Sequence, residues 1–516
     1  MSRIEQPVSA ASSLVGAIRQ AARAVGAPDG FEPQVERPAD SAHGDLASNA
    51  ALVLAKRLRR SPREIAEDLA ERLDLAGAGV SDVSVAGPGF LNFRLSDDVL
   101  KAGLLALLAA GDGWGRADAA PPLRYNVEFV SANPTGPLHV AHGRGAAIGD
   151  AVASLLSWTG HTVTREYYVN DAGRQIELLG ESVDARLRQS RGESVEMPEG
   201  GYQGQYVVEL AEQLAAELGE THLAEASSSE RVATLARLAS HRLREEQERD
   251  LADFGVEMEV WFEESSLFGA GDVESLLQRL RESGHSYRDE GALWLRTTDH
   301  GDEKDRVLFK SDGSHTYFAS DIAYHLDKAA RGFDRVIDVW GADHHGHVPR
   351  MRAALKSLGH SSEFFEALII QLVTVMRGGS EVRMSKRAGR FVTLRELYAE
   401  TGTDVARYFF LMRRAEVPMT FDLDLALDTS EANPVYKVQY AHARMCSVFR
   451  RGDVDPGSIS VTDAELEHLD SAAERQVLLA LLRFPERVQT AAAARAPYQI
   501  CNYLDEVAGV VNAWYH

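Results

Sequence analysis

Cysteine is scarce in this chain of 516 residues, which has only two, Cys446 and Cys501. No Cys-x-x-Cys pair and no His/Cys cluster has the spacing of a zinc site, so we expect no structural zinc and a reducing compartment. The chain also lacks any apolar run of the roughly 18 residues that a membrane span needs. Arg19 and Arg23 interrupt the apolar pattern near the N-terminus, which indicates an amphipathic helix rather than a signal peptide. We therefore expect a cytoplasmic protein with no membrane association.

An excess of basic residues is missing too. The chain has 55 Lys and Arg against 77 Asp and Glu, a formal net charge of −22. Nucleic-acid-binding proteins usually have a basic surface, so charge alone does not predict such a partner. Basic residues gather locally in three clusters, and each by itself is more typical of a solvated helix face. The clusters are Lys56, Arg57, Arg59, Arg60 and Arg63; Arg383, Lys386, Arg387 and Arg390; and Arg444, Arg450 and Arg451.

The composition is that of a folded globular protein, with 45% apolar and 26% charged residues, and the length is too great for one hydrophobic core. Periodicity predicts helices and a late strand pair in the first part, then a Gly/Ala/Pro-rich linker, GDGWGRADAAPP. After about Leu394 only helical patterns remain, which indicates an all-α region. The predicted domains are 1–115, 116–393 with a helical insertion at about 171–250 that begins behind Asp171 as N-cap, and 394–516.

The middle domain begins with a strand, a loop, a helix and a second strand. In LRYNVEFV (123–130) apolar and polar residues alternate; SANPTGPLH then leads into a helical pattern, and HTVTREYYV (161–169) returns to strand chemistry. This order predicts a βαβ unit in a parallel sheet and a nucleotide-binding architecture. A second half repeats the pattern, with a strand at 334–341, a helix at about 348–358 and a strand-like run at 367–376.

The first candidate motif, HVAHGRG, stands where the first loop enters its helix. His139 and His142 are three residues apart, so they lie on one side of a helical turn whose free N–H groups attract an anion such as a triphosphate. Gly143 permits close approach of a ligand to the backbone. For an isolated H-x-x-H the more common role is that both histidines cap or pack the loop.

The second candidate motif is Arg383-Met384-Ser385-Lys386-Arg387, in the Gly-flanked segment GGSEVRMSKRAGRF. A loop of this kind can close its cations over a pyrophosphate leaving group and stabilise the charge that develops in the transition state. Taken alone, the motif is more typical of a basic surface turn.

Together the two motifs resemble the HIGH and KMSKS elements of class I aminoacyl-tRNA synthetases. The chain is similar over nearly its whole length to the arginyl-tRNA synthetase family, through EFVSANPTGPLHVAHGRGAAIGD, GALWLRTTDHGDEKDRVLFKSDGSHTYFASDIAYHLDK and VWGADHHGHVPRMRAALKSLG. The resemblance implies a multidomain α/β protein: a Rossmann-like parallel-sheet catalytic domain with a helical insertion, an α+β N-terminal tRNA-binding domain, and an all-α C-terminal anticodon-binding domain. A non-catalytic tRNA-binding or regulatory homologue and another class I synthetase remain as alternatives.

The resemblance also implies site residues. The implied catalytic residues are His139, His142, Arg383 and Lys386; those for ATP are His139, His142, Gly143, Gly341, Asp343, Met384 and Lys386; and those for arginine are Glu128, Asn133, His139, Tyr317, Asp321 and His344. These types suit the ligand, because a guanidinium is a planar fork of five donors that needs carboxylate and other acceptors. Without the resemblance, Asp321 is better explained as a helix cap and Tyr317 as core. Adjacent His344 and His345 would point to different sides and so predict no metal site.

The implied reaction activates L-arginine with ATP and transfers it to tRNA(Arg), and family members generally need tRNA for the first step. Magnesium would arrive with ATP, and we expect a monomer. The sequence departs from the family pattern at Ala141, where glycine is usual, and at Arg383, where lysine is usual. It also stops at NAWYH, before the closing helices that the family usually has, so we expect impaired nucleotide affinity from the first departure and impaired tRNA recognition from the last.

Overall fold

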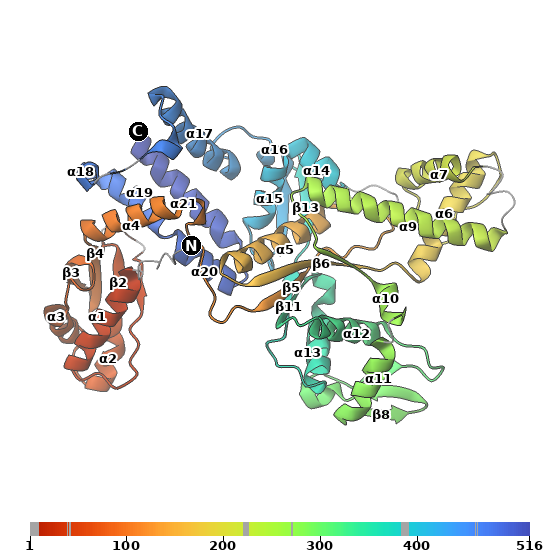
Figure 1. Ribbon diagram of the computed structural model, residues 1–516, viewed down its shortest axis with the longest axis horizontal. Coiled ribbons are helices and arrows are strands. Elements are labelled where there is room, and N and C mark those ends of the chain that lie inside the picture. The colour runs from red at the N-terminus through yellow and green to blue at the C-terminus, as the bar shows by residue number, and fades with distance from the viewer. Residues whose placement is uncertain are drawn as a thin grey trace. The chain divides into compact units, whose positions relative to one another are not determined.

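The computed structural model describes residues 10–38, 40, 43–219, 227–269, 272–382, 392–459, 461 and 463–516 (Figure 1). The chain forms two compact units. The first contains Met1–Gly115, Tyr440–Glu486 and Leu504–His516, and the second contains Arg116–Gln439 and Arg487–Tyr503. Among the described residues, no helix combines the length and the apolar character needed to cross a membrane.

The second unit is built on a parallel sheet of five strands in the order β12-β11-β5-β6-β7. Its strands are β5 (Arg124–Glu128), β6 (Thr162–Val169), β7 (Val260–Glu263), β11 (Arg335–Gly341) and β12 (Phe365–Ile370). Helix α5 (Val140–Trp158) connects β5 to β6, which pair in parallel, so the predicted βαβ unit is confirmed. The direction in which successive strands are added to the sheet reverses between β5 and β11. Ligands of such folds bind at the carboxyl ends of the strands beside this point, so we expect the site there.

Both faces of this sheet are covered (Figure 1). On one face Tyr125, Val127 and Phe129 pack with α5 in a buried core that also contains α14 (Leu394–Thr401) and α15 (Thr403–Leu411). On the other face lie α12 (Tyr317–Ala330) and α13 (Val348–Ser357), whose apolar residues form a second core with the sheet. The alternating residues of β5 therefore point to opposite faces of the sheet, and both faces are buried.

The second face carries a row of carboxylates. In the strand register Asp338 of β11 lies opposite Glu128 of β5, and Glu128 lies opposite Glu166 of β6. All three are buried under α12. Charges in such a position must be paired, because the interior solvates them poorly.

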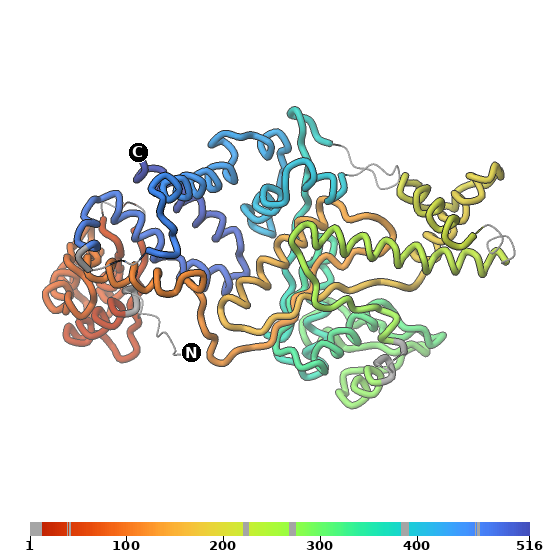
Figure 2. Tube along the Cα trace, turned by 45° about the horizontal axis from the view of Figure 1, so that its top comes forward, coloured from red at the N-terminus to blue at the C-terminus, as the bar shows by residue number. Residues whose placement is uncertain are grey.

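The helical insertion is confirmed, although its first cap differs from the prediction. It contains α6 (Arg174–Ser190), α7 (Gln205–Leu218) and α9 (Ser228–Asp253), and α6 and α9 lie side by side in both views (Figure 2). The prediction that Asp171 is the N-cap is wrong: Gly173 holds that position, and the Asp171 carboxylate accepts hydrogen bonds from Ser265, 2.6 Å from its hydroxyl. A long-range partner therefore outweighs the local capping preference.

Two smaller sheets complete the second unit. One is the antiparallel sheet of β8 (Ser286–Asp289), β9 (Ala292–Leu295) and β10 (Arg306–Phe309), next in sequence to α10 (Glu264–Gly269) and α11 (Asp272–Ser283). The other contains β13 (Val373–Arg377), β14 (Ser380–Glu381) and β15 (Met419–Asp422). The single strand expected at 367–376 is thus two strands in different sheets, and β15 interrupts the region expected to be all-α; a short helix, α16 (Leu423–Ala426), follows it.

The first unit joins both ends of the chain. Its sheet has the order β1-β2-β4-β3. The elements from the N-terminal part are α1 (Ala10–Ala24), β1 (Val35–Glu36), β2 (Leu46–Ser48), α2 (Ala50–Leu58), α3 (Pro62–Arg72), β3 (Val80–Ala86), β4 (Phe90–Leu95) and α4 (Asp97–Ala110). The later helices are α17 (Pro434–Gly452), α18 (Asp463–Leu466), α19 (Ala472–Leu482), α20 (Phe484–Ala493) and α21 (Tyr498–Tyr515). The start of α17, most of α20 and the start of α21 belong to the second unit.

Helix α19 enters the core of the N-terminal part. Leu478 and Leu479 are buried with Leu91 and Phe93 of β4, and Arg475 donates to the carboxylate of Asp45 at 2.6 Å. Residues separated by nearly the whole sequence therefore share one hydrophobic core.

Candidate functional site

The two histidines of the HVAH turn stand at the start of α5, directly after the loop from β5. The backbone N–H of His139 donates to Nδ1 of His142 at 3.3 Å, and the two rings stack with centroids 3.6 Å apart. The turn also pairs with the chain that follows the second motif: Leu394 N–H donates to Leu138 at 2.8 Å and Val140 N–H to Val392 at 3.3 Å. The histidines thus cap the helix, as the conservative interpretation expected, at the sheet edge where a ligand is expected.

The second motif lies outside the described residues, which omit 383–391. The predictions for Arg383, Met384 and Lys386 therefore stay predictions. On the preceding side the chain leaves β14, which pairs with β13, and on the following side Val392 and Leu394 bond to the HVAH turn. The described residues Val392 and Leu394 therefore lie beside the turn.

Gly143 has a packing reason of its own. It is buried, and a Cβ there would lie 2.6 Å from Leu394 Cδ1 and 3.1 Å from Phe410. The absent side chain lets α5 approach α14 and α15, so the glycine is explained without a nucleotide, and its predicted ATP contact stays a prediction. Ala141, by contrast, is exposed, so its methyl group faces outward from the first turn.

Two residues just past β5 have left-handed backbone conformations. Val130 has a φ of 70° and Ser131 a φ of 40°. Such conformations in residues other than glycine cost roughly 1–3 kcal/mol each and gather at functional sites. Hydrogen bonds hold the bend: Ser131 Oγ donates to Glu128 at 2.9 Å and accepts from the N–H of Tyr168 at 3.1 Å.

The rest of this loop is held by the helical insertion and β6. Gln247 of α9, which is buried, donates to the carbonyls of Asn133 and Gly136 at 3.1 and 2.9 Å, and Tyr206 of α7 donates to that of Thr135 at 2.8 Å. The Asn133 side chain donates to Gln175. Sequence reasoning missed these supporting residues, because nothing local connects a helical glutamine to a loop more than a hundred residues earlier.

Three carboxylates gather around Tyr168 of β6. Burial raises the pKa of Tyr168, and the charges of Glu264, Asp321 and Glu128 raise it further. We call Glu128, Asp321 and Glu264 the acidic cluster. Two members were predicted from the sequence, and the structure brings them together at the carboxyl edge of the sheet.

Glu264 is the member that sequence reasoning missed. Its side chain is buried, with 8% of the residue exposed, and it forms no ion pair with any Lys, Arg or His of the described residues. Burial raises its pKa, the charge of Asp321 adds to this, and a hydrogen bond from Tyr168 opposes it. The available signal was its position directly after β7, where a parallel strand delivers the next side chain to the ligand edge.

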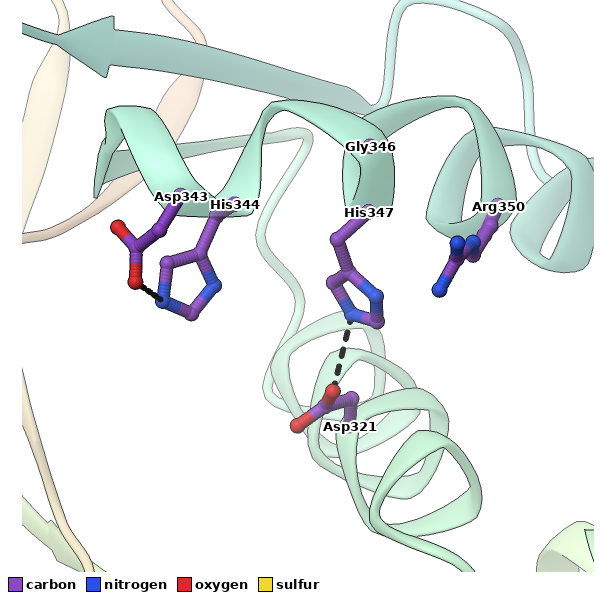
Figure 3. A pocket seen from close by; sticks show the side chains of 6 residues that line it. All are labelled: Asp321, Asp343, His344, Gly346, His347 and Arg350. Atoms are coloured by element: carbon purple, nitrogen blue, oxygen red, sulfur yellow. Dashed lines mark ion pairs between the residues drawn. The ribbon is translucent and has the colours of Figure 1, made fainter.

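A cavity of about 310 Å³ opens beside Asp321 (Figure 3). Its lining residues are Asp321, Asp343, His344, Gly346, His347 and Arg350. His347 reaches from the helical segment toward α12, where its Nε2 lies 3.0 Å from Asp321 Oδ2. Asp321 and His344, expected to contact arginine, thus share a cavity with Asp343, expected to contact ATP.

Gly341 ends β11 and precedes the short helix η4 (Ala342–His347). A Cβ at Gly341 would lie 2.6 Å from Asp343 Oδ1, so glycine allows that carboxylate to fold back over the strand end. The side chain of Asp343 is 84% exposed, and its Oδ2 lies 3.6 Å from Nε2 of His344. As expected, the two adjacent histidines diverge: His344 lines this cavity and His345 lines another.

Tyr317 and Asp321 lie one turn apart on α12, and neither local explanation applies. Tyr317 is 81% exposed and so is not core. The helix is capped by Thr316, whose hydroxyl accepts from the N–H of Ala319, so Asp321 is not the cap. Tyr317 is therefore left for another role, while Asp321 pairs with His347 across the cavity.

Metal binding has no obvious site here. In the described part of the chain, no three His, Cys, Asp or Glu side chains come together as ligands for one ion.

Comparisons with known proteins agree along the chain. Family models match the arginyl tRNA synthetase N-terminal domain over residues 12–95, the class I (R) tRNA synthetase catalytic domain over 119–414 and the DALR anticodon-binding domain over 438–516. The arginine–tRNA ligase of Bacillus subtilis is 44% identical over 482 residues, which is 93% of this chain and 86% of that protein. That of Nitratidesulfovibrio vulgaris is 46% identical over 511 residues, 98% and 92% of the two chains.

Solved structures show the same likeness. An arginyl-tRNA synthetase structure from Campylobacter jejuni has a TM-score of 0.76 and 34% identity over 82% of this chain and 91% of its own. The enzyme from Thermus thermophilus has a TM-score of 0.74 and 25% identity, covering 98% and 92%. The sequence matches, the parallel sheet and the gathered acidic residues all agree: the chain belongs to the arginyl-tRNA synthetases, a family of class I aminoacyl-tRNA synthetases.

Proposed function

We propose that the chain activates L-arginine with ATP and transfers the arginyl group to tRNA(Arg), releasing AMP and pyrophosphate. The observation that carries the choice of amino acid is the acidic cluster. It contains Glu264, a buried carboxylate without a cationic partner among the described residues. Because an uncompensated buried charge is costly, such a group is best explained by a cationic ligand that completes it.

The guanidinium and α-ammonium groups of arginine supply that charge. A guanidinium offers five donors in a fixed plane and pairs well with carboxylates. Glu264, Asp321 and Glu128 offer acceptors from three elements, and exposed Tyr317 stands one turn from Asp321. We assign this cluster, together with Asn133 of the loop that follows β5, to the arginine side chain and ammonium group.

ATP binding is assigned to the same edge of the sheet. The stacked His139 and His142 and the start of α5 would meet the phosphates, and Gly341 with exposed Asp343 would meet the ribose. Magnesium, carried by the phosphate oxygens, would supply charge neutralisation. Lys386 and Arg383 of the second motif are assigned to the departing pyrophosphate.

Neither step of this reaction needs a protein nucleophile. The arginine carboxylate attacks the α-phosphate of ATP, and the terminal ribose hydroxyl of tRNA then attacks the activated acyl carbon. The chain's contribution is orientation and stabilisation of charge by the histidines and the cations of the second motif. The domains at 1–115 and 394–516 are assigned to tRNA binding. We expect the enzyme to act as a monomer.

Arginine-dependent ATP–pyrophosphate exchange, measured with and without tRNA, tests the proposal. We expect exchange with arginine and tRNA, none with citrulline, which has the same shape without the charge, and little with lysine. Transfer of labelled arginine to tRNA would complete the test. A chain that binds tRNA but catalyses no exchange would be a non-catalytic homologue, and exchange with another amino acid would identify another class I synthetase.

A further inference from the structure

The carboxylate row on the sheet presents an electrostatic problem. Asp338, Glu128 and Glu166 are directly opposite one another on adjacent strands, and they are 0%, 7% and 0% exposed. Neighbouring strands are about 4.8 Å apart, and like charges that close favour protonation of one of them. The row can therefore stay ionised only if cations reach each member.

Helix α12 and the residue that caps it supply these cations. His325, Lys328 and Arg331 follow each other at intervals of three, so they lie along one side of the helix. Arg331 donates to both oxygens of Glu166, at 2.6 and 2.8 Å, and His325 Nε2 lies 2.9 Å from Asp338.

Lys328 completes the set and is the cation of Glu128. Its Nζ donates to Glu128 at 2.6 Å and to Asp338 at 3.0 Å, and the side chain is 0% exposed. No other Lys, Arg or His of the described residues forms an ion pair with Glu128. Burial alone would lower the pKa of Lys328, but the charges of Asp338, Glu128 and Glu166 outweigh it and raise that pKa.

Glu128 is therefore held from two directions. Lys328 of α12 donates a hydrogen bond to one carboxylate oxygen, and Ser131 of the bent loop donates to the other. Each oxygen keeps room for a further hydrogen bond, because an ionised carboxylate has about four acceptor positions. Glu128 is also a member of the acidic cluster, and its charge raises the pKa of Tyr168.

We propose that Lys328 is a positioning residue for substrate recognition: it keeps Glu128 ionised and fixed in orientation so that Glu128 can accept the cationic group of arginine. The inference rests on the proposed function, since it assumes that Glu128 contacts arginine. A purely structural role would be met as well by apolar residues, which often replace buried ion pairs without loss of stability.

Loss of Lys328 would change the charge of Glu128 in a known direction. Burial already raises the pKa of Glu128, and Lys328 is the largest influence that opposes the rise. Asp338 has a pKa lowered to about 2, because Lys328 and then His325 overcome its burial, and His325 would remain beside it. Other groups facing the pair are Glu166, Arg331, Tyr324, Tyr168, Asp321 and Glu264. Without Lys328 the pKa of Glu128 would therefore rise further, which favours the protonated carboxyl group.

The test compares Lys328→Met, Glu128→Gln and the double variant with the wild-type chain in arginine- and tRNA-dependent ATP–pyrophosphate exchange between roughly pH 6.5 and 9.5. For Lys328→Met we expect the KM for arginine to rise at least about tenfold near neutral pH, with a smaller change in kcat and an unchanged KM for ATP. Above the new pKa, Glu128 ionises and the KM should fall back toward the wild-type value. The double variant has no ionisable group at position 128, so its KM should show no alkaline recovery.

An unchanged KM for arginine in folded Lys328→Met, or a rise that is equal at every pH, overturns the inference. If Lys328→Met does not fold, Asp338→Asn provides the test. In that variant Lys328 pairs with Glu128 alone, so the rise in the KM for arginine at acid pH should move to lower pH. No shift, or a shift to higher pH, overturns the inference. Absence of exchange by the wild-type chain would instead count against the proposed function.

Discussion

Glu264→Gln tests the assignment of the acidic cluster, because it removes one charge with little change in shape. In the wild-type chain Glu264 has 8% of its surface exposed and no ion-pair partner in the described part of the chain. A hydrogen bond between charged groups contributes about 1.5–3 kcal/mol, and each 1.4 kcal/mol is a factor of ten in affinity. We expect the KM for arginine to rise about 10- to 150-fold, with a much smaller effect on the KM for ATP.

The same substitution, although it weakens arginine binding, should stabilise the ligand-free protein at neutral pH. Burial, followed by the charge of Asp321, raises the pKa of Glu264, so the folded state binds this proton more tightly than the unfolded state. Ionisation of Glu264 therefore destabilises the fold as pH rises above the unfolded pKa, which is about 4.3, and the full cost is present above the folded pKa. Glu264→Gln removes that cost, so its unfolding midpoint relative to the wild type should increase from acid to neutral pH.

The assays are steady-state exchange kinetics and thermal unfolding of the ligand-free chain across that pH range. The matched control is Glu263→Gln, which removes the same charge from the exposed neighbouring residue and should change neither quantity. The assignment is refuted if Glu264→Gln leaves the KM for arginine unchanged, or if Glu263→Gln raises it equally. A variant that loses both stability and arginine binding would show that Glu264 is a structural residue instead.

Three further predictions follow from packing and from the second motif. Gly143→Ala should destabilise the second unit by about 1–3 kcal/mol through overpacking and lower activity, whereas Gly145→Ala, whose Cβ meets only ordinary contact at 3.6 Å, should be tolerated in thermal unfolding and exchange assays. Leu479→Ala should cost about 2–5 kcal/mol and reduce hydrogen-exchange protection in the N-terminal sheet, unlike Leu108→Ala on an exposed surface. Lys386→Ala should slow activation more than it weakens arginine binding, and an unchanged single-turnover activation rate with equal arginine affinity would contradict its assigned role.

The parts of the fold that sequence reasoning predicted are those with local signals. Alternation in LRYNVEFV, the helical pattern after SANPTGPLH and the strand chemistry of HTVTREYYV together predicted the βαβ unit, which the structure confirms. The long run at 367–376 was harder, because its apolar residues continue while the backbone leaves one sheet at Gln371 and enters another at Val373. Apolar character alone does not show which sheet a strand joins.

The acidic cluster shows the same limit for the site. Glu128 and Asp321 could be named because each lies in a segment that resembles the family, but their meeting around Tyr168 depends on strand order and helix placement. Glu264 and Lys328 were missed because their significance lies in charge pairing across elements. The strand register that places Glu128 between two other carboxylates is a long-range property with no local pattern.

The shared core of the first unit affects how the protein folds during synthesis. The N-terminal sheet ends at Leu95, but Leu478 and Leu479, which complete its core, are made nearly four hundred residues later. At the usual 5–20 residues per second the ribosome needs roughly 20 to 80 s to cover that distance. During that interval the emerging N-terminal part has an uncovered apolar surface, so we expect it to depend on chaperones until α19 leaves the ribosome.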